Sequence, residues 1–451
     1  MNQLTEEQIV QLSPDAPSLK AGKELAHEKN WVSFGQNERV LWGEIKGSGK
    51  DPYRTQIDLN NTGFKCSCPS RKFPCKHGLG LYLIFARNPA AIPETETEPD
   101  WVKDWIDKRQ DRAEKKVEDA SKPITDEEVE KKNKQKAKSQ NKRLDEVSGG
   151  VAELDLWLRD LLRAGFLNLP DKKYQFWQKT AARMVDAKAP GLGNLVKEFG
   201  NINFFDGNTW QSAALTQSAR IFLLLEAFKN YEKLPETLQE DVKSLIGINK
   251  TQKELLESTD SESLKDIWLN LGRQRSKDDE NDLTIQKDWL YGFKAKRFAL
   301  LLNFAYKNQP IQIILVPATA THADLVFYPS YFPLRAVVKG QGNTVANLPE
   351  PDFLPDWKEA TDFLMEIQTK MPWIDEIPVL VGDLRLVFNI STWFLQDKQD
   401  FLMPLAGEFD EDRILQLLAL SGGVSLKMAL IYKKSAFLPL GIWYEGKYTL
   451  V

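Results

Sequence analysis

The 451-residue sequence predicts an α+β protein built from a small ββα unit, a charged linker, a helical domain and a mostly antiparallel, β-rich C-terminal domain. Three observations support this fold class. Short alternating runs precede one apolar helix in the first 92 residues, a strongly charged stretch follows, and the apolar spacing later changes from helical to strand-like. The expected boundaries are residues 1–92, 93–148, 149–296 and 297–451.

The composition is typical of a globular protein, with 42% hydrophobic and 27% charged residues. The 60 basic and 64 acidic residues give a net charge of −4, so nucleic acid could be bound only through a local basic patch. The N-terminus lacks the basic and apolar regions of a secretion signal, and the apolar runs are too short to cross a membrane. We therefore expect a cytoplasmic protein with no membrane partner.

The first unit begins with alternating apolar and polar positions between residues 31 and 60, which predict an antiparallel hairpin. The sequence HGLGLYLIFAR follows from His77 and ends at Asn88-Pro89, which predicts a short buried helix. The intervening Gly47-Ser48-Gly49-Lys50 lacks the first glycine and the Ser/Thr of a phosphate-binding loop. It is interpreted as a hairpin turn.

Residues 93–148 are expected to form a linker. Positions 101 to 146 hold 14 basic and 12 acidic residues and few large apolar ones, which allows a solvated helix but not a packed core. The segment should be exposed and mobile, with Trp101 and Trp105 as its most favourable anchors. Its end, residues 131–143, carries seven basic residues and no acidic one.

Apolar residues return at helical spacing from Val151, through Leu154, Leu158 and Leu161, and predict a helical domain. From about residue 297 the chain consists of apolar runs bounded by Gly, Pro, Asn or Asp, which predict strands of a meandering antiparallel sheet. Two interruptions, residues 356–370 and 411–420, have helical patterns. The C-terminal part should therefore be α+β and not a pure barrel.

The three cysteines of the chain all lie between positions 66 and 75, in the pattern C-x-C-x6-C-x-H. Three thiolates and one imidazole are the Cys3His set of a structural zinc site. Residues two apart in a strand face the same way, so Cys66 and Cys68 can bind one ion, and Cys75 and His77 follow at the start of the predicted helix. We predict one Zn²⁺ held by Cys66, Cys68, Cys75 and His77, which makes the first unit a zinc-bound ββα finger.

Four protein ligands leave no open position for water, so the zinc should be structural and not catalytic. The basic residues Lys65, Arg71, Lys72 and Lys76 can offset the negative charge of three thiolates and one zinc ion. Two alternatives stay open. The cysteines could be buried structural thiols beside an incidental histidine, or a Cys-His pair could act as a nucleophile.

The pattern C-x-C-x(n)-C-x-H, preceded by a hairpin and followed by an apolar helix that starts with CKH, resembles the SWIM zinc finger over residues 30 to 90. Phrases such as Ala182-Arg183-Met184-Val185-Asp186 and Pro190-Gly191-Leu192 are similar to long bacterial SWIM zinc finger proteins. The resemblance implies zinc binding together with protein or DNA interaction. It also implies MoxR-type AAA ATPases and von Willebrand A domain proteins as partners.

The sequence thus predicts a zinc-binding interaction or adaptor protein without enzymatic activity. His27 and His322 are expected at the surface or in loops, and neither has a recognisable catalytic triad around it. The alternative is a nucleic-acid-binding protein that uses the finger and the basic linker. A third class, an enzyme with its site in the C-terminal domain, would require a deep pocket with convergent polar groups.

Overall fold

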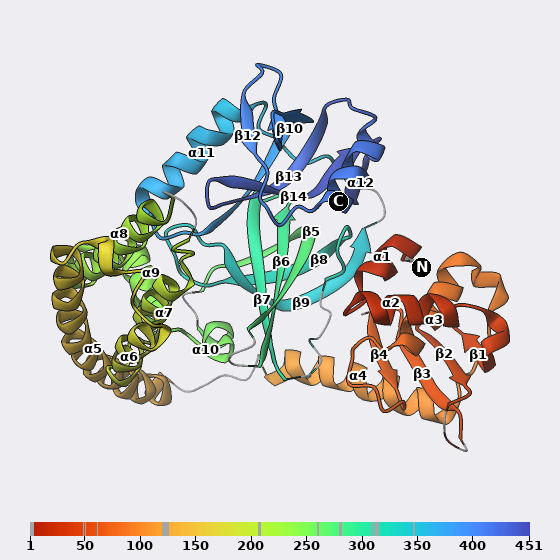
Figure 1. Cartoon of the computed structure of the whole chain (residues 1–451). Coiled ribbons are helices and arrows are strands. Elements are labelled where there is room, and N and C mark those ends of the chain that lie inside the picture. Colours follow the sequence, from red (N-terminus) through yellow and green to blue (C-terminus); the bar gives the residue numbers. More distant parts are fainter. Residues whose placement is uncertain are drawn as a thin grey trace.

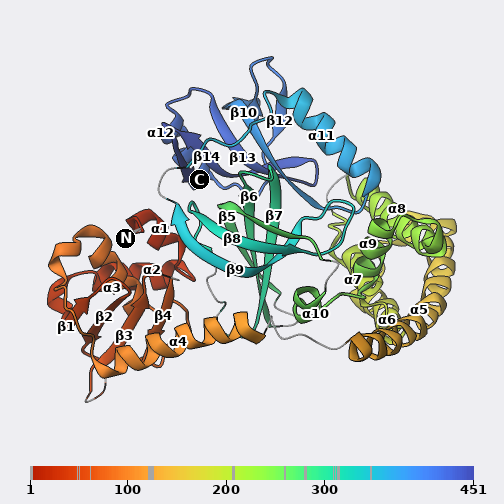
Figure 2. The same ribbon diagram turned by 180° about the vertical axis from the view of Figure 1, so that it is seen from behind.

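The computed structural model describes residues 4–47, 49, 51–60, 62–119, 126–205, 209–258, 261–278, 282–307, 309, 311, 315–345 and 348–451, with the side chains of 110–119 and 126–143 left out. It has the predicted α+β class. A barrel lies at the centre, with a helical bundle on one side, the finger on the other and a second sheet above it (Figures 1 and 2).

The finger is a four-stranded antiparallel sheet, in the order β1-β2-β3-β4, covered by helices. Helix α3 lies between this sheet and the N-terminal helices, so every residue from His77 to Phe85 is buried. The elements are α1 (Glu6–Gln11), α2 (Ala16–Leu25), β1 (Trp31–Gln36), β2 (Val40–Ile45), β3 (Tyr53–Asp58), β4 (Gly63–Cys66) and α3 (Lys76–Arg87). The predicted hairpin is thus part of a larger sheet.

The first part of the expected linker packs on the finger, which corrects the prediction for residues 93–148. Helix α4 (Asp100–Asp119) buries Val102 and Ile106, and Val102 packs with Val40 and Trp42 of β2. The expected anchors Trp101 and Trp105 are partly buried in the same cluster. These four apolar residues are two adjacent pairs one helical turn apart, which together form a narrow stripe. The average composition of the charged segment conceals this stripe. We therefore define the finger as residues 4–109.

Two ion pairs fasten α4 to the sheet. The guanidinium of Arg39 lies 3.0 Å from Asp107, and Arg109 lies 3.0 Å from Asp58, whose side chain is buried. Arg39 also bonds Glu98, just before α4. The basic run 131–143 belongs to helix α5 (Asp126–Arg163), but its side chains lie outside those that the structure describes. The exposure and mobility expected of that run therefore stay predictions.

The helical bundle packs around a cluster of aromatic rings. Trp177 stacks on Phe199 with ring centroids 5.1 Å apart, and Trp157 meets Trp177 edge-on. Its helices after α5 are α6 (Tyr174–Asp186), α7 (Pro190–Glu198), α8 (Thr209–Lys229), α9 (Glu236–Ile246) and, beside the barrel, α10 (Gln252–Glu257). A Cβ atom on Gly191 would lie 1.8 Å from the carbonyl oxygen of Leu245, so only glycine permits α7 to approach the end of α9 this closely.

The barrel begins at Ser263, well before the expected start of the strands at residue 297. It closes in the order β5-β6-β7-β9-β8, and all its pairings are antiparallel except the short parallel contact between β7 and β9. The strands are β5 (Ser263–Asp278), β6 (Leu283–Gly292), β7 (Arg297–Tyr306), β8 (Ala320–Phe327) and β9 (Arg335–Val345). The C-terminal part also holds a second sheet and two helices, so it is α+β and not a pure barrel, as predicted. The assignment of residues 263–292 to the helical domain, however, was wrong.

The physical reason is the polar interior at one end of the barrel. Asn270, Gln286 and Asp288 are buried there, so β5 and β6 do not show the apolar-in, polar-out alternation that marks a strand. One of the apolar runs expected to form strands, IQIILVPA at residues 311–318, includes residues 312–314, which lie outside the described residues. His322 lies in β8 with an exposed side chain, at the surface as expected.

The C-terminal sheet has the order β12-β11-β10-β13-β14-β15 and is antiparallel. Its core merges with the outer face of the barrel, where the hydroxyl of Tyr448 donates to the carbonyl oxygen of Leu271 at 2.7 Å. The two expected helices are present. The elements are α11 (Trp357–Lys370), β10 (Glu376–Asn389), β11 (Thr392–Gln396), β12 (Leu402–Pro404), α12 (Glu411–Ser421), β13 (Leu426–Lys433), β14 (Ala436–Tyr444) and β15 (Lys447–Leu450).

Candidate metal centre

The structure brings the four predicted ligands together. The donor atoms of Cys66, Cys68, Cys75 and His77 all lie within 4.8 Å of one another. The Nδ1 atom of His77 is 3.7 Å from the sulfur of Cys66 and 4.0 Å from that of Cys75. Ligands at zinc bond lengths on a tetrahedron are about 3.5–3.8 Å apart, so the cluster fits one structural zinc ion.

Two elements position the ligands. Cys66 is the last residue of β4 and pairs with Thr55 of β3, whose hydroxyl lies 3.1 Å from the Cys66 sulfur. Cys75 is the N-cap of α3, and His77 lies in the first turn with 5% of its surface exposed. The backbone N–H groups of this turn favour negative charge on the Cys75 sulfur.

Aromatic rings pack against the buried side of the centre, where Cys75 and His77 lie. Cys66 and Cys68 are partly exposed. The ring of Tyr53 lies 5.3 Å from the ring of His77, and Phe64 meets Phe73 edge-on at 6.0 Å. Sequence reasoning did not find Thr55 or Tyr53, because both lie on β3, more than ten residues before the cysteines. The feature that identifies Thr55 is the pairing of β3 with β4, in which Thr55 lies opposite Cys66.

The thiols share protons when no metal is present. A hydrogen bond with Cys75 lowers the pKa of Cys66 to about 4 and that of Cys68 to about 6. The same contact with Cys66 raises the pKa of Cys75 far above its ordinary value. Burial opposes a positive charge on His77, yet the Cys66 and Cys68 sulfurs still raise the pKa of this imidazole. Cys75 therefore holds its proton most firmly.

Zinc affinity should fall as the pH falls, because coordination displaces the Cys75 proton. We expect a loss of about tenfold per pH unit for each proton released, with a slope that steepens towards low pH as the His77 imidazole and the Cys68 thiol also take up protons. Competition against a chromophoric chelator between pH 5 and pH 8 measures this slope. An affinity that does not change over this range would contradict the expected proton release.

The four basic residues around the centre differ in their contacts. Lys72 lies 2.8 Å from Asp15, just before α2, and so connects the metal loop to the N-terminal helices. Lys65, Arg71 and Lys76 have exposed side chains. These three side chains are available to an external anion.

A cavity of about 1500 Å³ lies between the bundle, the barrel and the C-terminal sheet. Several of its charged groups form ion pairs. Arg220 lies 2.7 Å from Asp375, Lys250 lies 3.1 Å from Glu240, and Lys287 pairs with Glu376. The Arg220–Asp375 pair joins the bundle to the C-terminal sheet and the Lys287–Glu376 pair joins the barrel to that sheet, whereas the Lys250–Glu240 pair lies within the helical part. Asp241 instead accepts the Tyr331 N–H, and burial raises the pKa of this carboxyl and of Glu198.

The donor set, its burial and the ββα framework define a zinc finger with a structural metal centre. Residues 53–84 match the SWIM zinc finger, and residues 142–246 match the SWIM-associated four-helix bundle domain. The chain is a SWIM-type zinc finger protein, as the sequence predicted. Comparison with curated proteins and with solved structures gave no match. Among the described residues, no helix is long and apolar enough to span a membrane.

Proposed function

We propose that this zinc-binding protein is a non-enzymatic adaptor that acts through protein–protein contacts. The observation that supports this is an apolar patch at the tip of the β10–β11 hairpin, which we call the hairpin tip. Ile390 is 95% exposed and Phe388 60% exposed, and the ring of Phe388 contacts that of Trp393 at 5.1 Å. Contiguous exposed apolar side chains are typical of interaction sites.

The backbone at the hairpin tip has a conformation that is unfavourable for isoleucine. Asn389 pairs with Thr392, so the turn between them has two residues, and Ile390 adopts a φ of 57°. Turns of this kind favour Asn or Gly at that position, and a β-branched residue there costs about 1 kcal/mol. An isoleucine at this position does not stabilise the turn, which favours a role in binding.

The metal centre supports the absence of catalysis in this proposal. Four protein ligands fill the tetrahedral positions, which leaves no open position for a substrate at the metal. MoxR-type AAA ATPases and von Willebrand A domain proteins are the candidate partners, and this suggestion comes from the family resemblance alone. A partner for the tip needs an apolar pocket that accepts Ile390 and the neighbouring ring.

Ile390→Asn should weaken partner binding at least tenfold while leaving the fold intact. Asparagine suits the positive φ, so the free energy of unfolding should rise by about 1 kcal/mol. The measurement is quantitative affinity purification from the host, followed by binding assays with the purified partner. Val424→Asn, at another exposed apolar position, is the control. Equal binding by both variants and the unchanged protein would remove the tip from the proposal.

A second candidate function is nucleic-acid binding by the finger, favoured by the exposed basic side chains of Lys65, Arg71 and Lys76. If these three contact phosphates, the logarithm of the binding constant should fall with the logarithm of salt concentration with a slope of about −2 to −3. Titration of duplex and single-stranded DNA at several salt concentrations tests this. Weak binding with the same affinity at every salt concentration would exclude it.

A further inference from the structure

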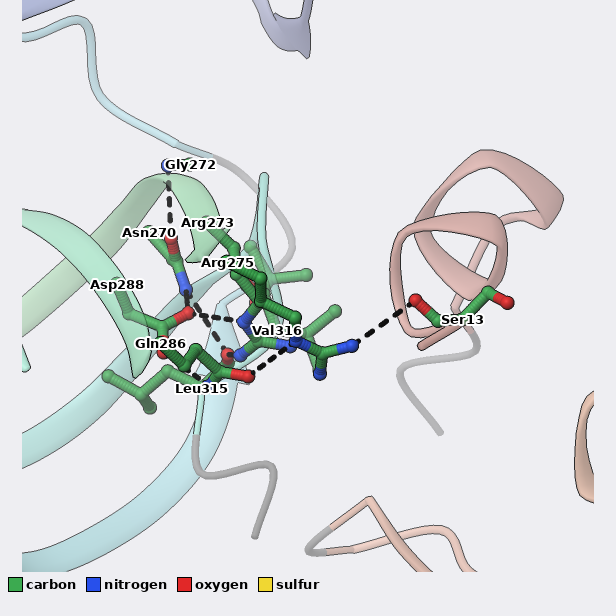
Figure 3. Close-up of polar contacts among 10 residues, drawn as sticks. Ser13, Asn270, Gly272, Arg273, Arg275, Gln286, Asp288, Leu315 and Val316 are labelled. Carbon is green, nitrogen blue, oxygen red and sulfur yellow. Dashed lines mark hydrogen bonds and ion pairs between the residues drawn. The ribbon is translucent and has the colours of Figure 1, made fainter. Parts of the chain in front are cut away.

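The finger contacts the barrel through the turn between α1 and α2. The Nη1 atom of Arg275 in β5 donates to the carbonyl oxygen of Ser13 at 3.3 Å, and Figure 3 shows this side chain reaching from the barrel to the turn. The side-chain amide of Gln8 in α1 donates to the carbonyl oxygen of Ala318, also at 3.3 Å. Val316 of the barrel is buried in the finger's own core cluster.

On the barrel side, Arg275 belongs to a buried polar network with an excess of positive charge. Its Nε atom donates to Gln286, which donates to Asp288, and Asp288 also pairs with Arg273 at 2.6 Å (Figure 3). Two guanidinium groups therefore share one carboxylate. Burial and the nearby Arg273 lower the pKa of Arg275 to about 10. The Ser13 carbonyl gives Arg275 an acceptor that the barrel strands do not supply.

On the finger side, the α1–α2 turn is held by the helix that carries two metal ligands. A Cβ atom on Gly22 of α2 would lie 2.9 Å from the Cβ of Leu79, and one on Gly80 of α3 would lie 3.1 Å from the Gly22 carbonyl oxygen. The two helices thus pack backbone to backbone, and α3 begins beside Cys75. Any shift of α3 must move α2 as well.

The metal loop, residues 67–75, is tied to the same turn. Lys72 pairs with Asp15, and the hydroxyl of Ser13 donates to the carbonyl oxygen of Asp15 at 2.9 Å. Asp15 also caps α2 by accepting the Ser18 N–H at 2.8 Å. The residue that Arg275 binds is therefore connected to the metal centre both through α3 and through the loop.

We propose that the α1–α2 turn is a zinc-dependent latch that holds the finger against the barrel. When the metal is lost, α3 and the metal loop lose their common anchor, the turn leaves the barrel, and Arg275 and the segment around Ala318 become accessible to water. The state of the metal centre is thereby transmitted to the barrel. This inference does not depend on which partner the protein binds.

Hydrogen–deuterium exchange on the full-length protein, with zinc bound and after removal by a chelator, tests the latch. Removal should speed exchange at least tenfold both in the metal loop and at residues 315–320 of the barrel. Strands β13 and β14, which do not touch the finger's turn, should keep their rates. Faster exchange confined to the finger, with residues 315–320 unchanged, would overturn the proposal.

Two variants break the latch without touching a metal ligand. Gln8→Glu keeps the oxygen that accepts the Thr5 N–H in the capping box but cannot donate to Ala318. Arg275→Met removes the bond to Ser13. Both should retain one zinc per chain by elemental analysis and yet exchange at least tenfold faster at residues 315–320.

Arg385→Met is the matched control, because Arg385 lies on β10 in the C-terminal sheet with an exposed ion pair to Asp400 at 3.7 Å. It should leave exchange at residues 315–320 unchanged. If Arg275→Met fails to fold, Gln8→Glu decides the matter, since it leaves every barrel residue in place. Wild-type exchange at residues 315–320 in Gln8→Glu with zinc bound would overturn the latch.

Discussion

Replacing Cys68 with serine should release the metal and unfold the finger, while the bundle, the barrel and the C-terminal sheet stay folded. A structural zinc ion contributes about 10–16 kcal/mol of apparent binding energy in small fingers, which exceeds the stability of most single domains. Strand β4 and helix α3 should lose their protection from hydrogen exchange first, because β4 ends at the ligand Cys66 and α3 begins at the ligands Cys75 and His77. The larger parts should survive because they have separate core clusters.

Elemental analysis, together with hydrogen–deuterium exchange across the chain, measures this result. The unchanged protein should contain one zinc per chain, because the sequence holds one Cys3His set. Ser70→Ala, in the same loop but without a ligand atom, should keep the metal. Two ions per chain, or none, would contradict the assignment of the centre. Retention of zinc by Cys68→Ser would remove this cysteine from the ligand set.

Replacing Arg273 with methionine should destabilise the barrel by about 3–5 kcal/mol. Its guanidinium and the Asp288 carboxylate are 2.6 Å apart, with 5% and 3% of their side-chain surfaces exposed. Removing Arg273 leaves the buried Asp288 carboxylate without its direct ion-pair partner, and such a loss is among the most costly single changes. Arg275 reaches this carboxylate only through Gln286. Hydrogen–deuterium exchange of strands β5 and β6 at increasing urea concentrations reports the stability of the barrel, because the fluorescence of 13 tryptophans cannot be assigned to this part alone.

The double variant Arg273→Met, Asp288→Leu distinguishes the effect of an unpaired buried charge from the effect of changing the side chains at these two positions. Replacing an isolated buried ion pair by apolar residues is often nearly neutral. Asp288 also accepts from Asn270 and Gln286, so the double variant should recover only part of the lost stability. Lys358→Met, at an exposed pair on α11, is the control and should show no measurable change. Arg273→Met with an unchanged unfolding midpoint would show that the pair does not support the barrel.

The metal centre could be predicted from sequence because its ligands are local. Cys66, Cys68, Cys75 and His77 lie within twelve residues, and a strand followed by a helix start suffices to bring them together. The same holds for helices α11 and α12, whose apolar spacing is regular. Each of these features depends on neighbours along the chain, and such patterns are visible without a fold.

The barrel and the docking of the finger could not be predicted, because both depend on contacts between distant residues. Asp288 pairs with Arg273 on another strand, and Ser13 meets Arg275 across 262 positions. Buried charges that satisfy one another look like surface residues in the sequence. The apolar stripe of α4 was missed for a related reason, since its partners Val40 and Trp42 lie on a strand 60 residues earlier.

The burial of helix α3 also determines which part of the finger could be transferred to another protein. Its side chains are buried from His77 to Phe85, with the sheet on one side and α1 and α2 on the other. A graft of the matched residues 53–84 into another protein would lack α1 and α2 and would therefore expose the apolar side chains of α3. Such an exposed apolar helix promotes aggregation, and two of the metal ligands lie at its start. The smallest portable unit is the finger as packed here, residues 4–109, which includes the N-terminal helices and the first turns of α4.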